Sequence, residues 1–159
     1  MICYNYDGDY MKIVLANDHH GIDLKGRIIS YLNSKNIEYI NLGCDEKNNV
    51  DYVDYAKLLC ECIKDGKADY GILICGTGIG MSIAANKVKG IRAAVCTDHF
   101  STKFTRLHNN TNVLCLGGRV LGDLFALELV DIFLNTEYEG GRHQRRIDMI
   151  TAIEKKYMK

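Results

Sequence analysis

The residue types best suited to chemistry lie between positions 75 and 80. Cys75 closes a short apolar run, and Gly76, Gly78 and Gly80 follow at alternate positions before a helix-forming stretch begins. Glycines at this spacing let the backbone turn tightly and point several N–H groups at one place, as in anion-binding loops at helix N-termini. The same field favours the thiolate of a cysteine, so Cys75 is a candidate base or nucleophile. The alternative is that Cys75 only fills the core, as many free cysteines do.

The elements that would position these residues can be predicted from hydrophobic periodicity, because segments typical of strands alternate along the chain with segments typical of helices. Short apolar runs predict strands over residues 12–17, 37–41, 70–75, 91–96 and 112–116. Stretches with helical spacing separate them. The pattern predicts an α/β fold of three layers (α/β/α), with a doubly wound, five-stranded parallel sheet of the Rossmann-like kind. We expect a single domain over residues 11–159, preceded by a mobile extension at 1–10 that shows neither period.

Two predicted helices have informative apolar faces. The helix after residue 53 carries a stripe of Tyr55, Leu58, Leu59, Cys62 and Ile63, which we expect to face the core and which leaves Cys60 outside it. The helix over residues 121–134 is apolar around most of its circumference. We therefore expect part of that second helix to meet a partner subunit.

Composition narrows the classes of function. The 20 basic and 20 acidic residues balance, so no overall field indicates nucleic acid or a membrane surface as partner. No apolar stretch reaches the length of a membrane span and no signal-peptide pattern opens the chain. Seven cysteines without a Cys-x-x-Cys pair argue against a disulfide framework or a zinc ribbon. We expect a cytoplasmic protein.

Polar residues follow several predicted strands at the sheet edge where open α/β folds bind ligands. They are Asp18, His19 and His20 after the first strand, Cys75 and its loop after the third, Asp98 and His99 after the fourth, and Arg119 after the fifth. His108 and Asn109 end a helix, so we expect them on the opposite rim of their own subunit. No metal site is expected, because adjacent histidines such as His19 and His20 tend to point apart and no known carboxylate–histidine spacing occurs.

A basic run before the last predicted helix is a candidate anion site. Arg145 and Arg146 fall in the first turn, where the helix dipole disfavours cations by several tenths of a kcal/mol. A bound anion would remove that conflict. The alternative is a solvated basic turn without a ligand.

Taken in order, these motifs closely resemble the type B ribose-5-phosphate isomerases, whose family also holds galactose- and allose-6-phosphate isomerases. The resemblance covers residues 11–158 and rests on separated motifs: Asp18-His19, Asp51-Tyr52, the block 71–80, Gly90-Ile91-Arg92-Ala93, His108 to Asn112, and Tyr138 to His143. It implies an aldose–ketose isomerase of the non-oxidative pentose phosphate pathway. The family works through an enediolate without metal or cofactor.

The resemblance also implies roles. Cys75 would be the base that removes the proton beside the carbonyl, because Met81 stands where a branch without the cysteine has an acidic base. The amides of Gly76, Thr77, Gly78, Ile79 and Gly80 would hold the oxyanion, and Thr77 would move a proton between oxygens. His108 would open the sugar ring with help from Asp18. Tyr52 and Asn109 would position hydroxyls, and the phosphate would be bound by His19, Arg142 and Arg146, with Arg119 close by.

The family resemblance further implies a homodimer or homotetramer with active sites shared between subunits, which would bring His108 and Asn109 into a neighbour's pocket. The preference for a five-carbon or a six-carbon sugar phosphate stays open. The rival hypothesis is a non-enzymatic nucleotide-binding module in which the glycine loop binds a pyrophosphate and Asp98 a ribose. Against it, Met81 replaces the third glycine of the dinucleotide fingerprint and the P-loop lysine is missing.

Overall fold

Five parallel strands form the middle layer of the computed structural model, which describes residues 11–158. They run in the order β2-β1-β3-β5-β4. Their bounds are β1 Lys12–Asn17, β2 Glu38–Asn41, β3 Tyr70–Cys75, β4 Ala93–Val95 and β5 Val113–Gly117. The predicted five-stranded parallel sheet is confirmed. The predicted N-terminal extension, residues 1–10, lies outside the described residues.

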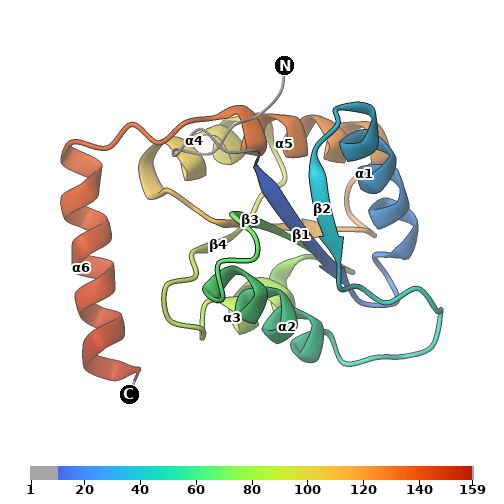
Figure 1. Cartoon of the computed structure of the whole chain (residues 1–159), viewed down its shortest axis with the longest axis horizontal. Coiled ribbons are helices and arrows are strands. Elements are labelled where there is room, and N and C mark those ends of the chain that lie inside the picture. The colour runs from blue at the N-terminus through green and yellow to red at the C-terminus, as the bar shows by residue number, and fades with distance from the viewer. Residues whose placement is uncertain (1–10, 159) are drawn as a thin grey trace.

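Helices cover both faces of the sheet, as Figure 1 shows. Their bounds are α1 Ile22–Ser34, α2 Tyr52–Lys64, α3 Ile79–Ala85, α4 His99–Asn109, α5 Asp123–Asn135 and α6 Arg142–Tyr157. α1 and α5 pack on one face around Ile13, Ile72 and Leu114, whereas α2 and α3 pack on the other around Val14 and Leu73. Alternate residues of each central strand thus enter different cores, which explains why β1 and β3 read as unbroken apolar runs.

The sixth helix lies beside this three-layer body (Figure 1) and contacts the chain mainly through α4. Ile147 and Glu154 are buried, and Glu154 accepts a 3.3 Å hydrogen bond from the N–H of Gly90. The other side of α6 exposes four large apolar side chains, Met149, Ile150, Ile153 and Tyr157. The sequence did not single out α6 for such a face. The expected partner contact was drawn for residues 121–134 and stays a prediction.

Most apolar side chains around α5 are buried by contacts within the same chain. α5 contacts α1, α4 and β5, and it buries Ala126, Leu129, Val130, Phe133 and Leu134. A helix enclosed on several sides needs no polar face there. Leu124 remains 79% exposed.

The predicted face of α2 is confirmed in part. Leu59 and Cys62 are buried as expected, but Cys60 is fully buried and Leu58 is 47% exposed, against expectation. The reason is that α2 contacts α3 as well as β1 and β3, so its buried face extends toward Ala56 and Cys60. Burial raises the pKa of the Cys60 thiol to about 11, which keeps this cysteine protonated and chemically inert. Within the described residues no helix combines the length and apolarity needed to span a bilayer.

Candidate active site

The site is built where the strand order changes direction. From β1 the chain goes to β2 on one side of the sheet and to β3 on the other, and such switch points leave a crevice at the carboxyl ends of the two strands. Asp18 follows β1 and Cys75 ends β3. The register pairs Asn17 with Ile74, so Asp18 and Cys75 occupy the next register position, and the N–H of Asp18 donates to the carbonyl of Ile74 at 3.1 Å.

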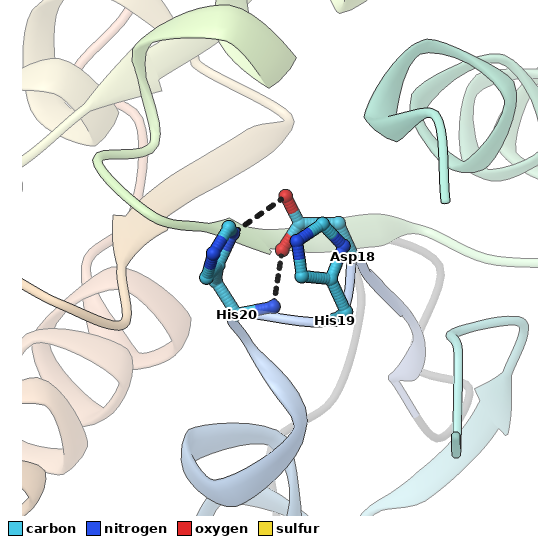
Figure 2. Close-up of side chains that lie close together, drawn as sticks. All are labelled: Asp18, His19 and His20. Atoms are coloured by element: carbon cyan, nitrogen blue, oxygen red, sulfur yellow. Dashed lines mark hydrogen bonds and ion pairs between the residues drawn. The ribbon is translucent and has the colours of Figure 1, made fainter. Parts of the chain in front are cut away.

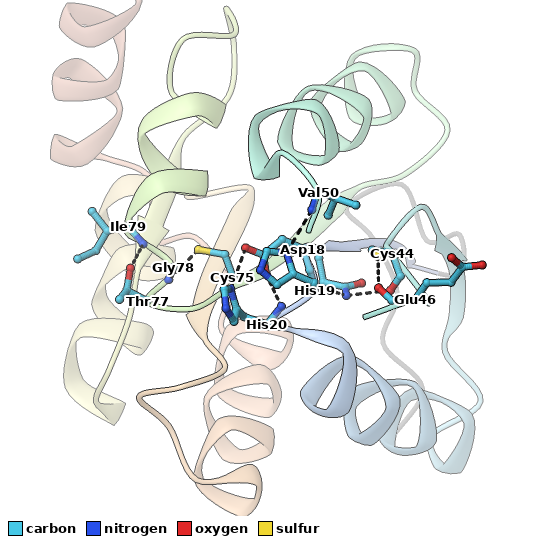
Figure 3. A network of polar contacts seen from close by, with 11 residues as sticks. Asp18, His19, His20, Cys44, Glu46, Val50, Cys75, Thr77, Gly78 and Ile79 are labelled. Carbon is cyan, nitrogen blue, oxygen red and sulfur yellow. Dashed lines mark hydrogen bonds and ion pairs between the residues drawn. The ribbon is translucent and has the colours of Figure 1, made fainter. Parts of the chain in front are cut away.

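Cys75 is held by the loop that follows it. Its side chain is nearly buried, and the N–H of Gly78 donates to Sγ over 3.2 Å (Figure 3). Gly78 adopts a left-handed φ of +79°, and a Cβ there would lie 3.1 Å from the Leu116 backbone, so only glycine fits without strain. The N–H of Ile79 donates to Oγ1 of Thr77 at 3.3 Å as α3 begins. The loop thus directs a main-chain donor at the sulfur.

A tight turn gathers three polar residues at the end of β1. The N–H of Gly21 donates to the carbonyl of Asp18, and this turn folds His19 and His20 toward the Asp18 carboxylate (Figure 2). The backbone N–H of His20 donates to Oδ1 of Asp18 at 2.8 Å, and its Nδ1 lies 3.6 Å from Oδ2. The two imidazole centroids are 3.9 Å apart. The expectation that these rings point apart is therefore wrong, because this tight turn folds both side chains toward the Asp18 carboxylate.

A hydrogen bond from the backbone of Val50 indicates which tautomer a neutral His19 adopts. The backbone N–H of Val50 donates to Nδ1 of His19 at 3.3 Å, as Figure 3 shows. Since that nitrogen accepts, the ring proton of a neutral His19 resides on Nε2, where it can be donated to an anion. Val50 was not singled out from the sequence, because a backbone donor in a loop leaves no residue-type signal.

Two further predicted residues reach the same edge. Tyr52 is the first residue of α2, and a Cβ on Gly80 would lie 2.8 Å from Cζ of its ring, so the phenol lies directly against the glycine loop. The N–H of Arg119 donates to the carbonyl of Gly76 at 3.1 Å, and its side chain runs past Gly76. Both side chains are exposed at the mouth of the crevice.

A second group lies elsewhere on the chain, where α4 ends and α6 begins. His108 stacks on His143 with ring centroids 4.0 Å apart and planes 10° apart. Glu139 places Oε2 at 3.6 Å from Nε2 of each ring. Arg142 donates from Nε to Nε2 of His143 at 3.2 Å. Because α4 starts after the carboxyl end of β4 and runs back, this group lies at the opposite rim, as expected for His108 and Asn109.

The structure therefore divides the predicted site residues into two groups. The first holds Asp18, His19, Tyr52, Cys75, Gly76, Thr77, Gly78, Ile79, Gly80 and Arg119; the second holds His108, Asn109, Arg142 and Arg146. Asn109, Arg142 and Arg146 are exposed. Within the described residues no hydrogen bond or ion pair joins the two groups. Glu139 was not predicted as a site residue, because its contact with His108 spans 31 positions of the chain.

Two sets of side chains come close enough to be considered as metal ligands. Asp18, His19 and His20 form one, and His108, Glu139 and His143 the other, with ligand atoms within 4.8 Å of one another. In the first, Oδ1 of Asp18 already accepts the N–H of His20. In the second, Nε2 of His143 already accepts a hydrogen bond from Nε of Arg142. One potential ligand atom of each set therefore has a hydrogen-bond partner within the chain.

The acid that the nucleotide-binding hypothesis needs has another role. Oδ1 of Asp98 accepts the N–H of Ser101 at 2.7 Å and caps α4. This hydrogen bond lowers the pKa of the Asp98 carboxyl. Asp98 also follows β4, an edge strand separated from β3 by β5. A ribose held by Asp98 would be remote from the loop after Cys75, which disfavours that hypothesis.

Comparison with known proteins assigns the chain to a family. Residues 13–150 match the family model described as Ribose/Galactose Isomerase. The chain is 47% identical over 145 residues to ribose-5-phosphate isomerase B of Escherichia coli, covering 91% of this chain and 97% of the relative.

Solved structures give the same result. The Clostridium thermocellum ribose-5-phosphate isomerase B superposes with a TM-score of 0.91 at 48% identity, covering 92% of this chain and 99% of that one. The Mycoplasma genitalium ribose-5-phosphate isomerase B, solved with bound ribulose-5-phosphate, superposes with a TM-score of 0.86 at 44% identity, covering 91% and 97%.

Proposed function

The chain belongs to the ribose/galactose isomerase family, and from this premise we propose that it interconverts D-ribose 5-phosphate and D-ribulose 5-phosphate through an enediolate. The observation that carries the proposal is the contact of the Gly78 N–H with Cys75 Sγ, at a switch point that also holds Asp18. A thiolate beside preorganised donors can take a carbon-bound proton while the developing oxyanion is stabilised. The substrate class agrees with the ribulose-5-phosphate in the Mycoplasma genitalium structure.

The proposed reaction has two stages. His108 protonates the ring oxygen as the C1–O4 bond of the furanose breaks, and Asp18 assists by taking the C1 hydroxyl proton, so the aldehyde forms without net proton change. The Cys75 thiolate then removes the C2 proton, and the electron pair moves through C1=C2 onto O1. The loop amides over 76–80 stabilise the negative charge on O1. Thr77 moves a proton between O1 and O2, and the thiol returns its proton to C1.

The phosphate is proposed to be bound by His19, Arg142 and Arg146, with Arg119 at the rim. His19 presents its Nε2 proton outward because Val50 occupies Nδ1. Guanidinium groups bind phosphate in a two-pronged manner, which suits Arg142 and Arg146 at the start of α6. A phosphate there would also offset the unfavourable position of the Arg142 cation in the first turn of α6.

Since the two groups of site residues lie at opposite rims of one chain, we propose that a second copy completes each site. The exposed apolar face of α6 is one surface available for that contact. A second apolar surface flanks the glycine loop and consists of Val53, Leu58, Ile79 and Ile83. Packing α6 of one subunit near α2 and α3 of the other would bury both surfaces and carry His108 and Arg142 toward Cys75.

Mixing two inactive variants tests the shared site. Cys75→Ala and His108→Asn homodimers are each expected to lose conversion of ribose 5-phosphate. After mixing and subunit exchange, a heterodimer has one site with both defects and one with neither, so activity should reappear. The absence of recovery, in mixtures where heterodimers are verified by mass spectrometry, would contradict shared sites.

The substrate itself is tested by assaying the purified protein side by side with ribose 5-phosphate, allose 6-phosphate and galactose 6-phosphate. We expect the largest kcat/KM for ribose 5-phosphate. A larger value for either six-carbon phosphate would replace the proposed substrate by the alternative within the same family. Tight binding of NAD or ATP without isomerase activity would instead support the nucleotide-binding module.

A further inference from the structure

Glu139 lies beside the ring proposed to open the sugar and is held there by its own backbone. Its N–H donates to the carbonyl of Leu107 at 3.0 Å, which ties residue 139 to the last turn of α4. The adjacent residue on that turn is His108. The carboxylate Oε2 consequently lies 3.6 Å from Nε2 of His108 and the same distance from Nε2 of His143.

Arg142 determines which of the two rings can carry a proton. Its Nε donates to Nε2 of His143 at 3.2 Å, so that nitrogen acts as an acceptor and His143 is neutral. Burial lowers the pKa of His143, and the positive charges of His108, Arg142 and Arg146 lower it further, whereas Glu139 opposes them. The His143 side chain is 3% exposed and that of His108 is 31% exposed. His143 is therefore the neutral, enclosed ring of the pair, and His108 is the ring that solvent and a ligand can reach.

The packing around His108 fixes its plane. One face stacks on the neutral ring of His143, and Phe104 contacts it edge to face with centroids 4.7 Å apart. Two protonated rings stacked at 4.0 Å would repel each other, so the neutral state of His143 is what permits a charged His108. Glu139 is the only carboxylate among the described residues in ion-pair distance of His108.

We propose that Glu139 is a positioning residue for ring opening: its carboxylate orients His108 and stabilises the protonated ring that donates to the sugar ring oxygen, with His143 as a neutral stacking support. This inference rests on the proposed isomerase function. It concerns only the first stage, in which the C1–O4 bond breaks. Proton transfer between C2 and C1 by Cys75 does not require it.

The two directions of the reaction separate the stages. Ribulose 5-phosphate is acyclic because the hydroxyl needed to close a five-membered ring carries the phosphate, so conversion from that side bypasses ring opening. For Glu139→Gln we expect kcat with ribose 5-phosphate to fall about tenfold or more, as for loss of acid–base assistance. With ribulose 5-phosphate we expect initial rates within about twofold of wild type. Glu139→Asp should recover part of the forward rate.

The control is Glu137→Gln, which removes the same charge from an exposed side chain two positions earlier on the same segment. It should leave both directions unchanged. A pH profile gives the second readout: because the carboxylate favours protonated His108, the basic limb of the forward profile should move to lower pH in Glu139→Gln.

Equal losses in both directions, or an unshifted forward profile, would overturn the role of Glu139 and leave only a structural one. An unchanged forward rate would overturn it as well. If the wild-type protein converts neither sugar phosphate, the proposed function itself fails, and that result is distinct from any effect of the variant.

Discussion

Replacement of Gly78 by alanine would separate the two reasons why glycine is needed after Cys75. The left-handed φ of +79° costs a residue with a side chain about 1–2 kcal/mol. A Cβ would also lie 3.1 Å from the Leu116 backbone and 3.2 Å from that of Cys115. Those atoms belong to β5 and cannot rotate away, so overpacking adds about 1–3 kcal/mol. Together we expect a loss of about 2–5 kcal/mol in unfolding free energy.

Gly66→Ala is the matched control. Gly66 has a similar φ of +69°, but no atom lies within 4 Å of its would-be Cβ. Gly66→Ala should lower the unfolding free energy only by the cost of the left-handed backbone conformation, about 1–2 kcal/mol. Urea unfolding of both variants and wild type at one protein concentration measures the difference. Equal losses in the two variants, or a Gly78→Ala protein as stable as wild type, would refute the close approach of the loop to β5.

Two further substitutions have distinct expected outcomes. A Cβ on Gly80 would displace the ring of Tyr52, so Gly80→Ala should raise KM severalfold in steady-state kinetics. Because alanine favours the helix, the variant should not lose stability. The control is Gly26→Ala within α1, where no atom lies within 4 Å of the added Cβ, and it should leave KM unchanged. The hydrogen bond and charge of Lys25 lower the pKa of Asp45. This stabilisation is present above the ordinary aspartate pKa of about 3.9 and is lost as pH falls through the lower folded value. Asp45→Asn should therefore be less stable than wild type at pH 7, and unfolding curves should show the gap closing in acid; a gap that persists in acid would contradict the ion pair.

The central strands were predictable almost to the residue, and the reason is burial on two faces. Lys12–Asn17 and the strand that ends at Cys75 have apolar residues at successive positions, a pattern that solvent-exposed segments do not keep. The edge strand β4 spans only Ala93–Val95, although the run over 91–96 predicted a longer one. Because β4 is an edge strand, it forms backbone hydrogen bonds with β5 on one side only, and fewer such bonds fix the residues at its two ends.

The parts of the candidate site that lie on one continuous segment could be predicted from the sequence. The parts that depend on how distant helices pack together could not. Cys75 and the glycines that follow it form one continuous loop, and the main-chain donor aimed at the sulfur could be expected from residue types alone. The approach of Glu139 to His108 depends on how the start of α6 packs against α4, which no spacing along the chain encodes. The exposure of Leu58 and burial of Cys60 have the same origin, because α3 covers a side of α2 that the helical period does not identify.

Deuterium exchange at C1 of ribulose 5-phosphate tests the role of the Cys75 sulfur most directly, since it reports proton removal without ring opening or turnover. In D₂O the wild-type protein should incorporate deuterium, whereas Cys75→Ala should lose exchange by about a thousandfold, a size typical of a missing general base. Calorimetry should show that the variant still binds the sugar phosphate. Exchange by Cys75→Ala at a rate near that of wild type would contradict the assignment of Cys75 as the base.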